Sequence, residues 1–226
     1  MIEDKQVGGI SASETASGYF CSNLALGLHA VAQPLTIVRA SLFKSYTNRM
    51  TRDELQELTR TLAPEVERVC ALFGSLQQLV QIESKKPHLS ELQILPLLAH
   101  AADGVELLYR KSGMFFNSVV PDSCEAVLLD RERTLEALSS VLLITHTLSH
   151  AKETVELIAA SSSSTVRVIV QNTASQVNSL NAQTSLTLAL AAANLRSQGA
   201  ALSWSFRPFR VEMNFQTAGS QQNNEL

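Results

Sequence analysis

Aromatic residues, basic runs and long hydrophobic stretches are scarce in this sequence of 226 residues. Phe, Trp and Tyr make up 5% of it, against 45% for all hydrophobic residues, which favours aliphatic helix–helix packing over a β-sandwich. Lys and Arg number 18 and Asp and Glu 21, for a formal net charge of −3. Without a dense basic run, this balance gives no electrostatic footprint for nucleic acid.

Cysteine is also rare. Cys21, Cys70 and Cys124 are odd in number and far apart, and no two of them form a CxxC pair. This pattern predicts a reducing, cytoplasmic setting, with Cys70 as a small core residue. The N-terminus has neither a basic segment nor an apolar run, so no signal peptide is predicted. No apolar run approaches the roughly 20 residues of a membrane-spanning helix, and no membrane partner is expected.

Residues 17–86 are predicted to form a helical hairpin after a flexible N-terminus over residues 1–16. Apolar residues alternate spacings of four and three, as on a helix seam, at Leu24, Leu28, Val31, Leu35, Val38 and Leu42. Thr51, with Glu54 three residues later, predicts a capping box at the start of a second helix, which Pro64 is expected to kink or locally interrupt. One hairpin leaves its apolar stripe half covered, so a homodimer with a four-helix bundle is predicted.

Residues 87–217 are predicted to form a mixed α/β sandwich with helices on one face of a sheet. Helices are expected over residues 90–110, 130–151 and 184–199, and strands over 113–120, 125–129, 165–172, 201–206 and 209–215. The serines at 161–164 are expected to form a hairpin-like connection, and residues 218–226 are expected to be disordered.

The segment LHAVAQPLTIVRASL, residues 28–42, resembles the phosphoacceptor box of sensor histidine kinases. In that family a histidine, an acidic residue and Pro-Leu-Thr recur on the first helix of a dimeric hairpin, and His29 and the segment 34–36 match in place. The resemblance implies that His29 is the phosphoacceptor and that Gln33 has a positioning or phosphatase role. Ala30 stands where the family carries an acid.

The second domain resembles the ATPase domain of these kinases, with its nucleotide motifs altered. Ser140 and Ile144 stand at the positions of two Mg/ATP-binding asparagines. The remaining departures are Asn172, Ala174 and Gln176 in place of Asp-Thr-Gly-x-Gly, and Ser185 and Thr187 in place of glycines. Side chains obstruct the close backbone approach to phosphate that glycine allows, and isoleucine offers Mg²⁺ no oxygen. The resemblance therefore implies a vestigial ATPase-like domain that binds no ATP, and no cofactor is predicted.

The other histidines give weaker signals. His146 and His150 have a helical spacing that could bind metal, but no third ligand accompanies them, so they are interpreted as helix-face or helix-end residues and no metal site is predicted. His29 itself could be an exposed helix histidine with no role.

These resemblances imply a histidine phosphotransferase that moves phosphoryl groups between response-regulator receiver domains through His29, with Mg²⁺ supplied by the receiver. The receiver is expected to dock around His29 on Ala32, Gln33, Thr36 and Arg39, and on Arg68 and Phe73 of the second helix. The alternative is a non-catalytic pseudokinase that binds a response regulator or a true histidine kinase on the same face. The altered nucleotide motifs disfavour an ATP-dependent kinase.

Overall fold

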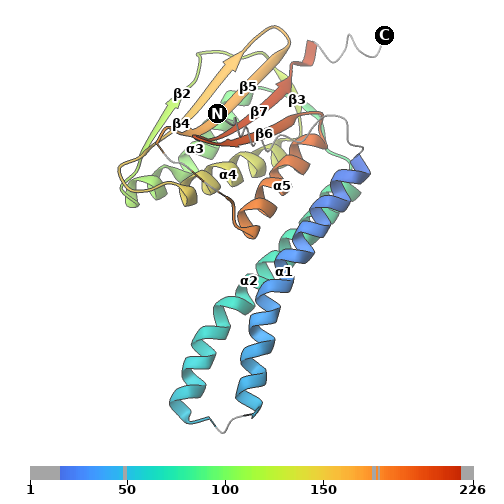
Figure 1. The fold of residues 1–226 in the computed structure, drawn as a ribbon. Coiled ribbons are helices and arrows are strands. Elements are labelled where there is room, and N and C mark those ends of the chain that lie inside the picture. Colours follow the sequence, from blue (N-terminus) through green and yellow to red (C-terminus); the bar gives the residue numbers. More distant parts are fainter. Residues whose placement is uncertain (1–15, 48–49, 175–176, 178, 220–226) are drawn as a thin grey trace, which may run out of the picture.

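The computed structural model describes residues 16–47, 50–174, 177 and 179–219 (Figure 1). A long two-helix hairpin projects from an α/β domain in which three helices lie against a sheet. Predictions for residues 1–15, for Gln176 and for residues 220–226 lie outside the described residues.

The hairpin consists of two helices, α1 (Ala16–Thr47) and α2 (Arg52–Ser84), which pack against each other. The predicted capping box is confirmed: the Glu54 N–H donates to Thr51 Oγ1 (3.3 Å), and the Thr51 N–H donates to Glu54 Oε2 (2.7 Å). The expected interruption at Pro64 is wrong, because α2 is one continuous helix through it. Cys70 is exposed on α2, which corrects its prediction as a core residue.

The main sheet has five strands in the order β2-β4-β5-β7-β6. Its strands are β2 (Phe115–Val119), β4 (Thr154–Ser161), β5 (Thr165–Asn172), β6 (Ala201–Phe206) and β7 (Phe209–Gln216). The β2–β4 pair is parallel and the other pairs are antiparallel. Helices α3 (Ile94–Lys111), α4 (Arg131–Leu148) and α5 (Ala182–Arg196) lie on one face of this sheet (Figure 1).

Several element boundaries differ from the sequence prediction. Residues Ser90–Leu92 form a short strand, β1, paired with β3 (Val127–Leu129), so the expected helix begins only at Ile94. The strand β4 was not anticipated, although the predicted hairpin connection after it is confirmed by the bond from the Ser162 N–H to the Thr165 carbonyl (2.8 Å).

The main core lies between the sheet and the three helices. Its largest fully buried side chains include Tyr109, Phe209 and Phe215. The Tyr109 hydroxyl donates to the Leu142 carbonyl (2.7 Å), and burial raises the pKa of this phenol well above its usual range. This bond satisfies the one polar group that the ring carries into the core.

Candidate functional site

His29 lies on the side of α1 that faces solvent. Its neighbours Ala30, Val31 and Pro34 are buried, whereas His29 is exposed. Since successive residues turn by 100° on a helix, His29 lies opposite this buried stripe. The other residues predicted for the docking face on α1, namely Ala32, Gln33, Thr36 and Arg39, are all exposed as well. We call these four residues and His29 the outer face of α1.

Two features give the outer face its local shape. Pro34 carries no N–H, so it offers no helical hydrogen bond to the carbonyl one turn before it. The Thr36 hydroxyl donates to the Ala32 carbonyl (2.8 Å) within the same helix. The Ala30 carbonyl therefore lacks its regular helical donor, whereas the Ala32 carbonyl accepts an additional bond from a side chain.

The two docking residues predicted on α2, Arg68 and Phe73, lie at different positions along the axis of the hairpin. Leu72 belongs to the same buried cluster as Ala30, so Phe73, which is exposed, lies near the level of His29 along the hairpin. Arg68 lies about one turn closer to the tip and has its Nη1 3.7 Å from Glu65 Oε2. The structure thus brings Phe73 to the level of the histidine and commits Arg68 to an ion pair.

Helix α5 of the second domain packs on the hairpin next to His29. Ala30 and Val31 share a buried cluster with Leu76 of α2 and Leu186 of α5. The approach is close: a Cβ added at Gly27 would collide with Leu76 Cδ2 and would lie 3.5 Å from Leu186 Cδ1. The second domain therefore packs on the buried side of α1, opposite the outer face, at the level of His29 along the helix.

This packing gives a physical reason for Ala30. The alanine is 3% exposed and surrounded by leucines, so an acidic side chain at this position would have to be buried without a partner among them. Sequence reasoning interpreted Ala30 only as a lost acid. The contact that buries it was missed, because it joins residues far apart in the chain.

The end of α2 is tied to the second domain by a set of polar contacts that the sequence did not reveal. Arg133 Nη1 donates to Ser197 Oγ (2.7 Å) and to the Ile82 carbonyl (3.3 Å). Its Nη2 donates to the Lys85 carbonyl (2.7 Å). Asp130 Oδ2 accepts from the His88 N–H (2.7 Å).

An ion pair and an apolar cluster complete these contacts. Arg196 Nη2 lies 2.7 Å from Glu83 Oε1, with both side chains about three-quarters buried. Next to it, Leu79 and Ile82 of α2 share a buried cluster with Leu190 and Ala193 of α5. We call the polar contacts of Arg133, Asp130 and Arg196 the linker clamp, since they hold residues 82–88 against the α/β domain.

Three of the residues predicted to replace the nucleotide motifs, Ser140, Ile144 and Thr187, line one depression, whereas Asn172, Ala174 and Ser185 do not. This depression has a volume of about 330 Å³ and is lined by Ser140, Leu143, Ile144, Thr147, Asn181, Gln183, Thr184 and Thr187. We call it the α4–α5 hollow. None of these described lining residues is charged, so they supply neither a carboxylate for Mg²⁺ nor a cation for phosphate.

Asn172, at the end of β5, is committed to the protein itself. The side chain is 1% exposed, and its Nδ2 donates to Ser149 Oγ (2.6 Å) and to Glu153 Oε2 (2.7 Å). Its Oδ1 accepts from the Ala174 N–H (2.9 Å). The amide therefore links the end of α4 to the end of β5, and both hydrogens of its nitrogen are donated within the protein.

His146 and His150 do not come together as metal ligands. His146 Nε2 is 2.9 Å from Ser112 Oγ, and its ring packs edge-on against Tyr109. His150 Nδ1 is 3.6 Å from Glu153 Oε1. Within the part of the chain that the structure describes, no group of three or more His, Cys, Asp or Glu residues could hold a metal ion.

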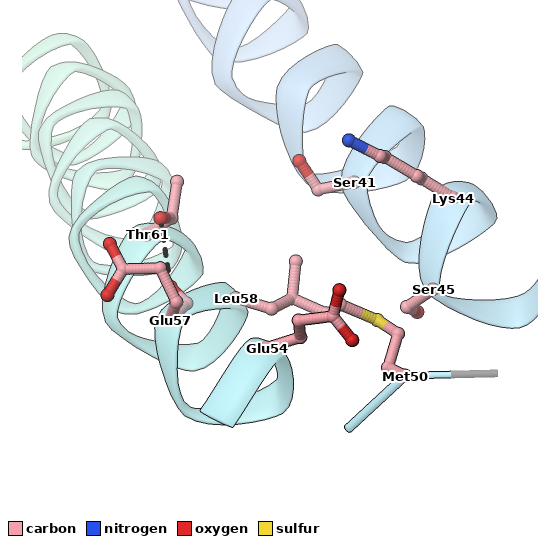
Figure 2. A pocket seen from close by; sticks show the side chains of 8 residues that line it. All are labelled: Ser41, Lys44, Ser45, Met50, Glu54, Glu57, Leu58 and Thr61. Carbon is pink, nitrogen blue, oxygen red and sulfur yellow. Dashed lines mark hydrogen bonds between the residues drawn. The ribbon is translucent and has the colours of Figure 1, made fainter. Parts of the chain in front are cut away.

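A second depression lies at the tip of the hairpin. Figure 2 shows Ser41, Lys44 and Ser45 of α1 facing Glu54, Glu57, Leu58 and Thr61 of α2, with Met50 of the turn between them. Bonds from Thr51 hold the pKa of Glu54 below its usual range, and Lys44 adds to this effect. The lining contains no nucleophilic histidine or cysteine, and the tip is far along α1 from His29.

One helix of the described residues, the segment Ser22–Tyr46 of α1, is long and apolar enough to cross a membrane by length and composition. This differs from the expectation that no such run exists, because apolar residues outnumber the Ser, Thr and Gln residues that interrupt the segment. In the structure this segment is one arm of the hairpin, and its buried stripe packs against α2 and α5.

Comparison with solved structures identifies this architecture. Histidine kinase AdeS of Acinetobacter baumannii matches with a TM-score of 0.60 at 15% identity, over 84% of this chain and 96% of that one. Histidine kinase ThkA, in complex with the response regulator TrrA, matches with a TM-score of 0.64 at 14% identity, over 84% and 59%. Full-length ShkA, in complex with AMPPNP, matches with a TM-score of 0.57 at 15% identity, over 89% and 43%.

These likenesses are of fold. No protein-family model matches the sequence, and no curated protein matches it. The predicted architecture, a helical hairpin followed by the α/β domain of histidine kinases, is confirmed. The dimer and the loss of nucleotide binding stay predictions.

Proposed function

We propose that this chain, which has the fold of the histidine kinases, is a histidine phosphotransferase of two-component signalling. It moves phosphoryl groups between response-regulator receiver domains through His29 and uses no ATP. A homodimer in the cytoplasm is part of the proposal.

The observation that carries the proposal is the exposed imidazole of His29 on the outer face of α1, opposite the side that packs against α2 and α5. A neutral imidazole is a competent nucleophile toward an acyl phosphate. A ring nitrogen attacks the phosphorus of the receiver's aspartyl phosphate, the P–N bond forms, and the P–O bond to aspartate breaks. The electron pair leaves with the carboxylate, and the other ring nitrogen keeps its hydrogen. Transfer to a second receiver reverses these changes.

The α/β domain supports the absence of ATP chemistry. Its α4–α5 hollow is lined by uncharged residues, and the amide of Asn172 is committed to Ser149 and Glu153. An acyl phosphate already carries an activated phosphoryl group, so the chain needs only to position the imidazole, while the receiver supplies Mg²⁺.

The partner is proposed from two observations. ThkA, which shares this fold, is found in complex with the response regulator TrrA. The outer face of α1 also leaves room around His29 for a globular domain, because its members are all exposed.

The dimer is proposed from the apolar residues that one hairpin leaves exposed. They are Leu28, Leu35, Leu42, Leu55 and Val66, and they lie on both helices of the hairpin. A second hairpin would cover them in a four-helix bundle. The exposed thiol of Cys70 fits a reducing compartment.

The test uses receiver domains from the same genome, phosphorylated with radiolabelled acetyl phosphate and separated from it. Incubation with the full chain is expected to give label that is stable to base and labile to acid, and His29→Ala is expected to abolish it. A second receiver added afterwards is expected to take up the label. Binding of the receiver without label would support the pseudokinase alternative, and label from Mg-ATP alone would contradict the proposal.

A further inference from the structure

Strand β2 is an open edge of the main sheet. Among the described residues it pairs on one side only, with β4, and Figure 1 shows it at the margin of the sheet. The opposite edge, β6, is covered in part, because its Phe206 carbonyl accepts from the Val177 N–H (3.2 Å). A free strand edge offers a row of N–H and C=O groups, which is a template for another strand.

The composition of β2 does not protect this edge. Its sequence, FFNSV, carries neither a charge nor a proline, which are the usual devices that prevent edge strands from pairing. Phe115 and Val119 are 62% and 52% exposed, and Val120, directly after the strand, is 43% exposed. An apolar, uncharged edge of this kind is typical of a surface that another strand covers.

The pairing with β4 determines which backbone groups of β2 point outward. The Phe115 N–H donates to the Glu153 carbonyl (2.9 Å), on the side of β4. Since the backbone groups of successive residues in a strand point in alternate directions, those of Phe116 and Ser118 point to the free edge. Each of these two residues therefore offers a donor and an acceptor to a partner strand.

The side chains of β2 lie on two faces of the sheet. Phe116 packs against Tyr109, with ring centroids 5.2 Å apart, so it lies on the side of the helices. Because side chains alternate along a strand, Phe115, Asn117 and Val119 lie on the other face. Along this face the order is apolar, amide, apolar, which is the same in both directions.

We propose that β2 pairs with β2 of a second copy of this chain, in the antiparallel sense, about a twofold axis at Asn117. In this register Phe116 stands opposite Ser118 of the second copy, and the two residues exchange both of their N–H···O=C bonds. Phe115 stands opposite Val119 of the second copy, so apolar side chains meet on both sides of the Asn117 pair. The pairing joins two five-stranded sheets into one.

A depression beside β2 fits the same register. It has a volume of about 480 Å³, and its lining includes Met114 and Phe116 together with Glu106 and Arg110 of α3. Val120 of the second copy stands opposite Met114 in this register, on the side of the helices, and therefore at the depression. The exposed valine after the strand thus has an apolar contact in the second copy.

The inference goes beyond the proposed function, because it uses neither His29 nor a receiver domain. An extended segment of another protein is the general alternative for such an edge, but the symmetry of the register favours a second copy. Strands of this length bury less than the roughly 800 Å² per partner of a stable complex, so the pairing is weak and reversible. A hairpin dimer carries two such edges, and pairing through them joins dimers into larger assemblies.

The register is tested by a cysteine trap in the full chain carrying Cys70→Ser, which removes an exposed native thiol. Residues opposite each other at a non-hydrogen-bonded position have Cα atoms about 4.5 Å apart, within the range of a disulfide. With copper phenanthroline as the oxidant, Asn117→Cys is expected to give at least tenfold more cross-linked dimer than the Cys70→Ser chain. The matched control, Ser118→Cys, faces Phe116 of the second copy and is expected to stay at the background level.

Equal cross-linking of Asn117→Cys and Ser118→Cys would overturn the inference, as would no cross-linking of Asn117→Cys above background. A second pair of variants in the Asn117→Cys chain tests the side-chain contact. Val119→Lys places a charge opposite Phe115 and is expected to lower the cross-linked fraction at least fivefold. Leu143→Lys, at an exposed leucine of the α4–α5 hollow, is expected to change it less than twofold. Equal effects of the two lysines would contradict the proposed pairing.

Discussion

Replacing Leu186 by alanine tests whether α5 holds the hairpin beside His29. Leu186 is 1% exposed and contributes its side chain to the cluster with Ala30, Val31 and Leu76. Truncating a buried leucine costs about 2–5 kcal/mol through lost transfer free energy and the cavity left behind. Since this cluster lies between α5 and the hairpin, the substitution is expected to weaken the contact between the two domains.

Leu188 provides a matched control on the same helix. It is 0% exposed, but it belongs to the main core against the sheet and not to the cluster with α1. Leu188→Ala therefore removes the same atoms and is expected to lower the free energy of unfolding by a similar amount. It leaves intact the side chains that pack between α5 and the hairpin.

The assay is amide hydrogen exchange along residues 22–34 of α1 in both variants. A loss of 2–5 kcal/mol from the local contact corresponds to about 30- to 5,000-fold faster exchange there. Leu186→Ala is expected to accelerate exchange in this segment while the strands stay protected, and Leu188→Ala is expected to act mainly on the strands. Identical exchange of α1 in the two variants would refute the claim that Leu186 anchors α5 to the hairpin.

Three further predictions concern the hairpin and its clamp. Ala30→Glu is expected to lower the free energy of unfolding by about 2–4 kcal/mol in urea titrations, because it buries a carboxyl among leucines, and to give no label from Mg-ATP; an unchanged midpoint would argue against the buried contact. Although burial acts to raise it, bonds from the His88 and Arg133 N–H groups hold the pKa of Asp130 below its ordinary 3.8, so its stabilisation is present above that value and is lost as pH falls through the lowered pKa. Urea unfolding of Asp130→Asn should therefore show a flatter pH dependence below about pH 4 than the parent chain, and parallel curves would refute this. Thr51→Ala is expected to cost about 1 kcal/mol by removing the cap of α2, measured by thermal unfolding with Thr59→Ala as the mid-helix control, and equal effects of both variants would contradict it.

Local signals made the hairpin predictable. The spacing around His29 and the pair Thr51 and Glu54 each act within a few residues, and the helix and the cap that they predict are both present. The predicted seam is wrong for the single hairpin, because Leu28, Leu35 and Leu42 are exposed in it. The strand Thr165–Asn172 was predictable for the same reason, because its alternation follows from one buried face.

Long-range contacts explain what the sequence left open. Ser90–Leu92 is a strand because Val127–Leu129, almost 40 residues away, pairs with it, and nothing within the segment indicates this partner. Arg133 reads as an ordinary residue of the first turn of a helix, yet it bonds to Lys85 at a separation of 48. The burial of Ala30 likewise depends on Leu186.

The candidate site, too, has one part that local sequence predicts and one part that depends on long-range contacts. The residues of the outer face were identified from one short segment, and helical geometry alone places His29 away from its buried neighbours. The α4–α5 hollow could not be predicted, since its lining comes from two helices that meet only in the folded domain.

The most direct measurement of the central claim is phosphorus NMR of the full chain mixed with a receiver domain phosphorylated by acetyl phosphate and freed of it, with no nucleotide present. The account predicts a phosphohistidine resonance that grows as the aspartyl phosphate signal decays and that is absent in His29→Ala. Decay of the aspartyl phosphate to inorganic phosphate alone, at the same rate in the parent chain and in His29→Ala, would contradict it.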